Sequence, residues 1–157
     1  MSRIVSLLVM IALTCSCATS FAEECSKARY DELTRQAKHA DSERQWGTVV
    51  ESNRALLTEC RSLVGETDLV KVYDSLSVGL LMQEQFTQAI DMAKKCIEQD
   101  RKYNACMMTA AKAYYNLGDV GMARDYAREA VEVGSYDDYA AAVVIYAKDF
   151  LKKLEKK

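Results

Sequence analysis

The sequence repeats itself at a regular spacing, which restricts its fold to architectures built from copies of one unit. Each copy consists of two groups of small and apolar residues. The residues of the second group lie at positions i, i+3, i+4, i+7 and i+8, which form one face of an α-helix. The first copy consists of Leu76, Ser77, Leu80, Ala89, Met92, Ala93, Cys96 and Ile97. The second consists of Ala110, Ala111, Tyr114, Ala123, Tyr126, Ala127, Ala130 and Val131. These patterns predict helix pairs at residues 70–83 with 87–99 and 104–117 with 119–133. The linkers Glu84-Gln85-Phe86 and Gly118-Asp119-Val120 are short enough to force antiparallel hairpins.

A third copy lies upstream at a slightly longer spacing. Leu33, Gln36, Ala37 and Ala40 match Tyr73, Leu76, Ser77 and Leu80, and Trp46 matches Phe86. The extra residues fall in the Arg61–Asp68 connection, where an insertion costs little free energy. The chain contains no proline, so no residue interrupts these helices by removing an amide donor.

The pattern resembles the tetratricopeptide repeat family, which repeats a helix hairpin every ~34 residues with small residues where its helices cross. The residues that carry the resemblance are Ser77, Leu80, Phe86, Ala89, Ala93, Cys96, Ala111, Tyr114, Leu117, Gly118, Ala123, Tyr126 and Ala130. It implies an all-α superhelix, or solenoid, with repeats at about residues 28–60, 70–100 and 104–134. The alternative is an unrelated helical bundle in which the same stripes are simply core.

The last segment is expected to form a capping helix at about residues 136–155. Ser135 is a candidate N-cap, and lysines near the end of the helix suit its dipole. Tyr139, Val143, Tyr146 and Phe150 form a stripe that is expected to cover the open face of the third repeat.

Residues 1–22 have the layout of a secretory signal peptide. Arg3 precedes a short apolar run, and Ser20-Phe21-Ala22 offers small residues for cleavage before Glu23. The run is about half the length of a membrane-spanning helix. We therefore expect residues 23–157 to be exported to the periplasm or the exterior. An outer-membrane lipoprotein acylated at Cys15 or Cys17 is the alternative, and only then would the membrane be a partner.

Four cysteines follow the signal, and an oxidising compartment would allow them to form disulfides. Cys25 and Cys60 lie at one end of the first hairpin, and Cys96 and Cys106 lie at one end of two adjacent helices. The pairs Cys25–Cys60 and Cys96–Cys106 therefore need the least distortion. The alternative for the second pair is two free, buried, small side chains.

The sequence offers no catalytic constellation, so we expect neither an enzyme nor a metal or other cofactor. It has one histidine, His39, no CxxC spacing and no glycine-rich phosphate loop. The net charge of −2 provides no basic field for nucleic acid.

The resemblance implies a protein-binding module whose concave groove, lined by the first helix of each repeat, holds a peptide or helix of another protein. The expected groove residues are Lys71, Asp74, Val78, Leu81, Met82, Met108, Lys112, Tyr115 and Asn116. Their mixture of apolar and charged side chains suits an amphipathic segment. In the alternative, Val78, Leu81 and Met108 are core. The other function class is a structural or assembly subunit of an envelope or secretion complex, with or without a lipid anchor.

Overall fold

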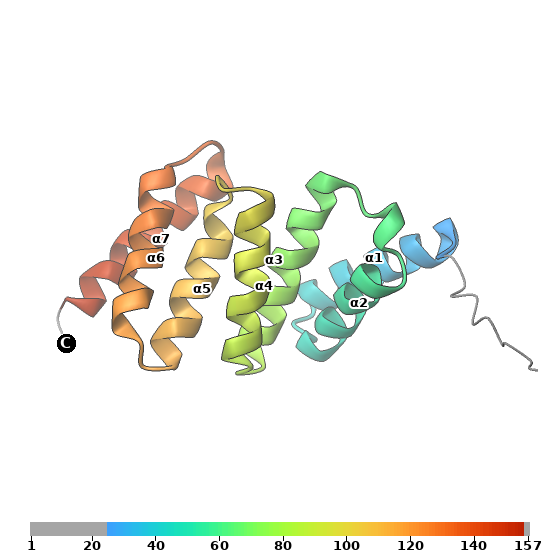
Figure 1. The fold of residues 1–157 in the computed structure, drawn as a ribbon, viewed down its shortest axis with the longest axis horizontal. Coiled ribbons are helices and arrows are strands. Elements are labelled where there is room, and N and C mark those ends of the chain that lie inside the picture. Colours follow the sequence, from blue (N-terminus) through green and yellow to red (C-terminus); the bar gives the residue numbers. More distant parts are fainter. Residues whose placement is uncertain (1–24, 156–157) are drawn as a thin grey trace, which may run out of the picture.

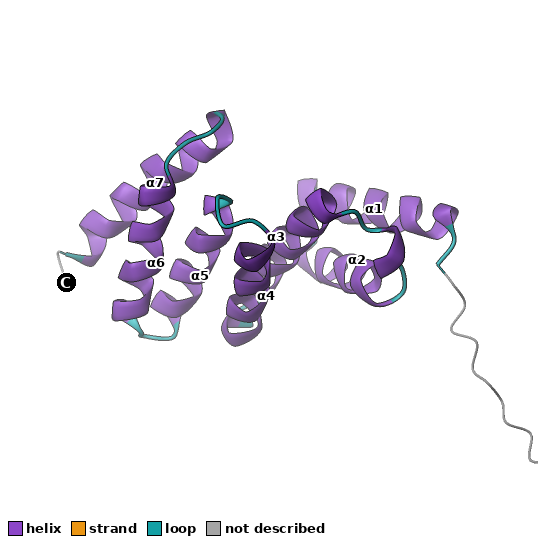
Figure 2. Ribbon diagram, turned by 45° about the horizontal axis from the view of Figure 1, so that its top comes forward, coloured by secondary structure: helices purple, strands orange, loops and turns teal. Residues whose placement is uncertain are grey.

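A computed structural model describes residues 25–155 as a row of antiparallel helices (Figure 1). The helices are α1 (Lys27–Ser42), α2 (Trp46–Thr58), α3 (Glu66–Met82), α4 (Phe86–Gln99), α5 (Asn104–Asn116), α6 (Val120–Val133) and α7 (Asp138–Leu154), with a 3-10 turn η1 (Arg61–Leu63) between α2 and α3. No strand occurs in the described part of the chain, and short loops join the helices (Figure 2). The predicted all-α solenoid of helix hairpins is confirmed.

Small side chains allow these helices to pack closely. Ala89 and Ala93 on α4 and Ala123 and Ala127 on α6 are fully buried. Between repeats, a Cβ added to Gly79 of α3 would lie 3.0 Å from Val50 Cγ2 on α2. The repeated small residues therefore set the helix spacing, and the larger Leu, Ile and Met side chains fill the layers between them.

The three hairpin turns share one geometry. After the C-cap of the first helix of each hairpin comes a residue at positive φ: Arg44 (55°), Glu84 (60°) or Gly118 (83°). The next residue donates its backbone N–H to a carbonyl five positions earlier, at 2.8, 2.9 and 3.0 Å respectively. This is the bond that closes a Schellman helix terminus. Only the third turn has the glycine that this backbone conformation favours.

The observed helix boundaries differ from the predicted ones mainly at two starts. Helix α3 begins at Glu66, one turn before the predicted start at residue 70, and Gly65 occupies its N-cap position. Helix α7 is capped by Asp137, whose carboxylate accepts a hydrogen bond from the Ala140 N–H at 2.7 Å. The prediction that Ser135 caps this helix is wrong, because the helix starts two residues later than that cap requires.

Helix α7 covers α5 and α6 with two of the four predicted residues, Val143 and Phe150, and with small residues that were not predicted. Its buried residues are Ala140, Ala147 and Leu154, with Val143 and Phe150 partly buried beside them. Tyr139 and Tyr146 are 56% and 46% exposed, so they do not cover α5 and α6 as predicted. Helix α7 begins 34 residues after α5, which is the spacing at which Ala110 and Ala111 of α5 follow Leu76 and Ser77 of α3. It therefore occupies the place of the first helix of a fourth hairpin.

The predicted signal peptide at residues 1–22 lies outside the described residues. Among residues 25–155, none of the helices has the length and hydropathy that spanning a membrane requires.

Candidate functional site

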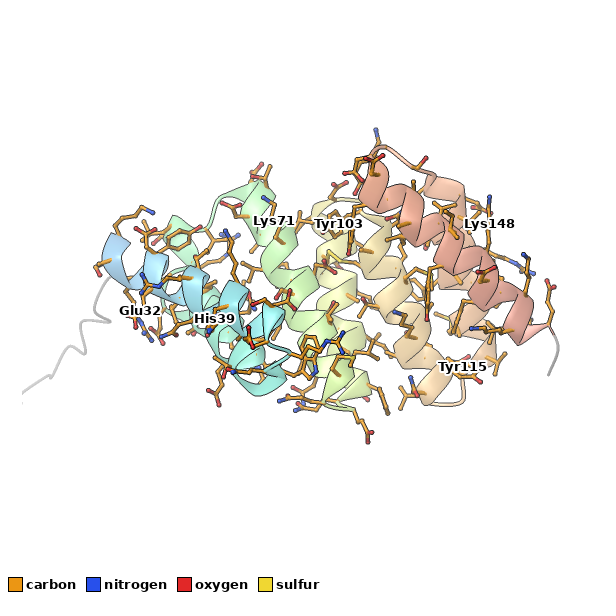
Figure 3. All side chains as sticks on the ribbon, turned by 180° about the vertical axis from the view of Figure 1, so that it is seen from behind. Glu32, His39, Lys71, Tyr103, Tyr115 and Lys148 are labelled. Atoms are coloured by element: carbon orange, nitrogen blue, oxygen red, sulfur yellow. A yellow bond between two sulfur atoms is a disulfide. The ribbon has the colours of Figure 1, made fainter. Side chains whose placement is uncertain are left out.

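The first helices of the repeats share one side of the molecule. Figure 3 looks onto this side, where α1, α3, α5 and α7 lie in front of α2, α4 and α6. We call the surface between these four helices the groove. It contains three hollows, named here the α1–α3 pocket (about 340 Å³), the Asp74 pocket (about 270 Å³) and the Tyr115 pocket (about 510 Å³). The last two share Lys112 and Tyr146 in their linings, so they adjoin each other.

The α1–α3 pocket has a mixed lining. Leu56 and Val72 form an apolar base, and Lys38, Asp41, Asp68, Lys71 and Thr34 are among the polar residues around it. The Lys71 ammonium pairs with Asp68 at 3.4 Å. The buried hydroxyl of Thr34 has no hydrogen-bond partner among the described residues. This end of the groove is therefore polar at its rim, and its charges balance.

The Asp74 pocket lies between α3, α5 and α7. Tyr103, in the loop before α5, donates a hydrogen bond from its hydroxyl to Asp74 Oδ2 at 3.2 Å. Burial raises the pKa of Asp74 to about 6, although the Tyr103 hydrogen bond lowers it. Tyr139 and Tyr146 of α7 form the opposite wall, and Met108, which is 4% exposed, lies beneath.

The Tyr115 pocket is more apolar. Met82 at the end of α3 is 52% exposed, and Leu81 and Phe86 lie beside it. The Tyr115 ring meets Phe150 of α7 edge to face, with ring centroids 5.7 Å apart. The Lys112 ammonium lies over the Tyr146 ring, 4.4 Å from its centroid, and burial lowers the pKa of Lys112.

All the residues expected in the groove line one of these pockets. Lys71 lies in the α1–α3 pocket, whereas Asp74, Val78, Met108 and Lys112 lie in the Asp74 pocket. Leu81, Met82, Lys112, Tyr115 and Asn116 lie in the Tyr115 pocket. Val78 and Leu81 are partly buried, and Met108 is largely core, as the alternative interpretation expected.

The sequence interpretation missed the contribution of α7 to the groove. Tyr139 and Tyr146 lie one repeat spacing after Ala105 and Lys112, which line the same pocket from α5. Extending the repeat register by one more helix would have placed both tyrosines on the groove. The sequence interpretation instead assigned both tyrosines to a stripe that covers the third repeat, because aromatic residues at helical spacing are usually core.

Two disulfides fix the frame of the groove. Cys25 is bonded to Cys60 with the Cα atoms 4.8 Å apart, and Cys96 is bonded to Cys106 with the Cα atoms 6.2 Å apart. These are the pairs that the hairpin geometry favours. The Cys106 sulfur lies 3.5 Å from Asp74 Oδ1, so the second bond holds the start of α5 against the acidic residue of α3. A disulfide sulfur carries no proton, so this is a contact and not a hydrogen bond.

A metal site would require a cluster of ligating side chains. No cluster of three or more His, Cys, Asp or Glu side chains able to hold a metal ion occurs among residues 25–155. What the groove offers instead is a long concave surface with exposed aromatic and methionine side chains. Such a surface can hold an extended or helical segment.

The fold is that of a tetratricopeptide-type solenoid. No protein-family model matches the sequence, and no curated protein does. Solved structures do match.

PcrH of Pseudomonas aeruginosa, in complex with the chaperone binding region of PopD, is similar in fold to this chain. The TM-score is 0.72, with 14% identity over 84% of this chain and 95% of that one. SycD, a type III secretion translocator chaperone of Yersinia enterocolitica, gives 0.68 with 15% identity over 82% and 91%. The TPR domain of Arabidopsis OM64 gives 0.63 with 19% identity over 80% and 96%. At these identities the likeness establishes the fold.

Proposed function

We propose that this chain is a non-catalytic protein-binding module that holds a peptide or helical segment of a partner protein in the groove. The observation that carries the proposal is the groove itself. Four helices line it, and they leave Met82, Tyr139 and Tyr146 about half exposed on its surface. Exposed large apolar side chains grouped in a concavity are typical of binding sites.

The structural neighbours support this proposal. PcrH, which has the same fold, was solved with the chaperone binding region of PopD bound. A protein segment is therefore a ligand that this architecture accepts. In the present chain the pockets have apolar bases and polar rims, which suits a segment with hydrophobic anchors along one side.

The proposal is tested by crosslinking and affinity capture from the native organism, followed by mass spectrometry. The informative variant carries Met82→Glu and Tyr146→Glu together, because both side chains are about half exposed in the Tyr115 pocket. Two carboxylates there would desolvate on binding and repel an apolar anchor, so the captured partner should be lost.

The matched control is Ile145→Glu. Ile145 neighbours Tyr146 on α7, is 65% exposed and lines neither pocket of that region. Unfolding temperatures should be similar for all the proteins. Capture that persists unchanged in the folded double variant contradicts the groove as the binding surface. Loss of capture only with Ile145→Glu would instead favour the alternative, an assembly subunit that docks through the end of the stack.

We further propose that the module works after export, in the periplasm or cell envelope. Two features support this: the signal-like residues 1–22, and cysteines that lie close enough to form two disulfides. N-terminal sequencing of protein from its native source should read from Glu23. An N-terminus blocked by an acylated Cys17 would show a lipoprotein instead.

A further inference from the structure

The Asp74 pocket contains a carboxylate that forms no ion pair with the described residues, although Lys112 lines the same pocket with its ammonium over the Tyr146 ring. Asp74 is partly buried, and the groups in contact with it are the Tyr103 hydroxyl and the Cys106 sulfur, both neutral. Of the ion pairs among residues 25–155, none includes Asp74. A desolvated carboxylate without a partner charge is costly, so such groups are normally paired.

The surroundings add negative potential. The pKa of Tyr139 is raised first by burial, then by the charge of Asp74 and, at longer range, by Asp41 and Asp137. The pKa of Tyr136 is raised by burial and by Asp137, Asp100 and Asp74. Carboxylates from α1, α3 and the N-cap of α7 therefore act on Tyr139, which lines the pocket. An incoming positive charge would be attracted to this pocket.

The walls of the pocket also suit a cation. Tyr139, which is 56% exposed, and Tyr146, which is 46% exposed, stand across from Asp74 on α7. Aromatic faces attract ammonium and guanidinium groups. Tyr146 already does so with Lys112, whose ammonium lies 4.4 Å from its ring centroid. Tyr139 has no such cation among the described residues.

We propose that the Asp74 pocket receives a lysine or arginine side chain of the bound partner segment, with Asp74 as its counter-ion and Tyr139 as its aromatic wall. This inference rests on the proposed function and names the chemistry by which the groove selects its partner. A segment that presents one basic residue among apolar anchors fits; a segment with a carboxylate at that place is repelled.

Lys112 provides a positive charge on the same wall of the groove as the negative charge of Asp74. It lies six residues after Cys106 on α5, or roughly 9 Å further along the helix at ~1.5 Å per residue. Asp74 lies against the Cys106 end of α5, so the backbone position of Lys112 is further along the same helix. A second basic residue of the partner would be unfavourable beside Lys112, whereas an apolar or acidic one would be accepted.

The experiment selects ligands from a phage-displayed library of random 16-residue peptides, using the full oxidised chain as bait. Peptides enriched by the protein should share one position occupied by Lys or Arg. The best peptide and an analogue with Gln at that position are then measured by fluorescence anisotropy. With the unmodified protein, the Gln analogue should bind at least tenfold more weakly, since a charge-assisted contact in a partly buried pocket is lost.

The protein variants locate the effect. With Asp74→Asn, the two peptides should differ by less than twofold. With Asp91→Asn, an equal change of net charge at an exposed position of α4 outside the groove pockets, the tenfold difference should remain. Circular dichroism verifies that the variants are folded, and the comparison of the two peptides on the unmodified protein needs no variant at all.

The outcomes separate the two proposals. If nothing is enriched, the proposed function fails and this inference fails with it. Enriched peptides that lack a shared basic position, or a Gln analogue that binds equally well, overturn the inference alone. The inference is also overturned if the Gln analogue loses as much affinity for Asp74→Asn as it does for the unmodified protein, because the basic side chain of the peptide would then bind elsewhere in the groove.

Discussion

The Tyr103 hydroxyl and the Asp74 carboxylate form a 3.2 Å hydrogen bond that joins the loop before α5 to the middle of α3. The two groups affect each other in opposite ways. The bond stabilises the charged form of Asp74, whereas burial and the nearby charge of Asp74 raise the pKa of Tyr103. For Asp74 burial outweighs the bond, so its pKa is raised from 3.8 to about 6.

This raised pKa predicts that Asp74→Asn stabilises the protein at pH 7.5. Between pH 3.8 and about 6 the native state holds the Asp74 proton and the unfolded chain releases it, so stability falls as the pH rises through this interval. The penalty is absent below pH 3.8 and complete above pH 6; from the pKa difference it amounts to about 3 kcal/mol. Asparagine can still accept the Tyr103 hydrogen bond and should recover about 2 kcal/mol of this.

Urea unfolding at pH 4 and pH 7.5 measures the effect. The gain from Asp74→Asn should be present at pH 7.5 and small at pH 4, and Asp91→Asn should show no such difference. A loss of stability at pH 7.5 would mean that the carboxylate is not destabilising in the native state. Residues that lower the stability of the free protein are common at functional sites, so this result would agree with a binding role of Asp74.

The disulfides predict a graded loss on removal. The Cys25–Cys60 bond closes 35 residues and the Cys96–Cys106 bond closes 10. Loop-closure entropy then gives about 3.8 and about 2.7 kcal/mol respectively. Cys25→Ala with Cys60→Ala should therefore lower the free energy of unfolding more than Cys96→Ala with Cys106→Ala. Denatured protein purified without reductant should show no free thiol from these residues. Four free thiols would contradict both bonds.

The shared hairpin turn predicts that Arg44→Gly is stabilising. Arg44 has φ 55°, where a side chain costs about 1–2 kcal/mol. Glycine removes that cost but adds freedom to the unfolded chain, which leaves a net gain of about 0.5–1 kcal/mol. Glu43→Gly is the matched control, because the φ of −89° at Glu43 suits any residue. This variant should lower the free energy of unfolding by about as much as Arg44→Gly raises it. Thermal unfolding of both variants is the measurement. Equal losses would show that the turn is not strained at residue 44.

Much of the fold follows from spacing in the sequence. The repeat register and the small crossing residues specify which helices pair, because a helix pair with alanines at its crossing has few other ways to pack. The pairing of Cys96 with Cys106 then follows from which ends of the helices meet. The starts of the helices were harder to predict. Helices α3 and α7 begin after the N-cap residues Gly65 and Asp137, and the spacing of apolar residues does not indicate where an N-cap lies.

The groove could be predicted only in part. Lys71, Met82 and Tyr115 lie where the register of α3 and α5 places them. The uncompensated charge of Asp74 could not be read from the sequence, because it depends on which side chains of other elements approach it. Tyr103 and Cys106, its two neighbours, lie 29 and 32 residues further along the chain. No local pattern connects them with α3.

Asn104 provides the last prediction, since it attaches α7 to the rest of the solenoid. It is fully buried, and its Nδ2 donates to the Gly134 carbonyl at 3.0 Å and to the Ala140 carbonyl at 3.1 Å. Asn104→Ala removes both bonds and should cost about 2–3 kcal/mol, because the buried Ala140 carbonyl and the half-buried Gly134 carbonyl both lose this donor. Amides of α7 should exchange with deuterium faster than those of α3 and α4, and any ligand of the Asp74 pocket should bind more weakly. Asn116→Ala is the control: its exposed side chain bonds within its own helix, to the Lys112 carbonyl, and should change stability by less than about 0.5 kcal/mol. If α7 exchanges as slowly in Asn104→Ala as in the unmodified protein, apolar packing of Ala140, Ala147 and Leu154 alone suffices to hold the groove wall.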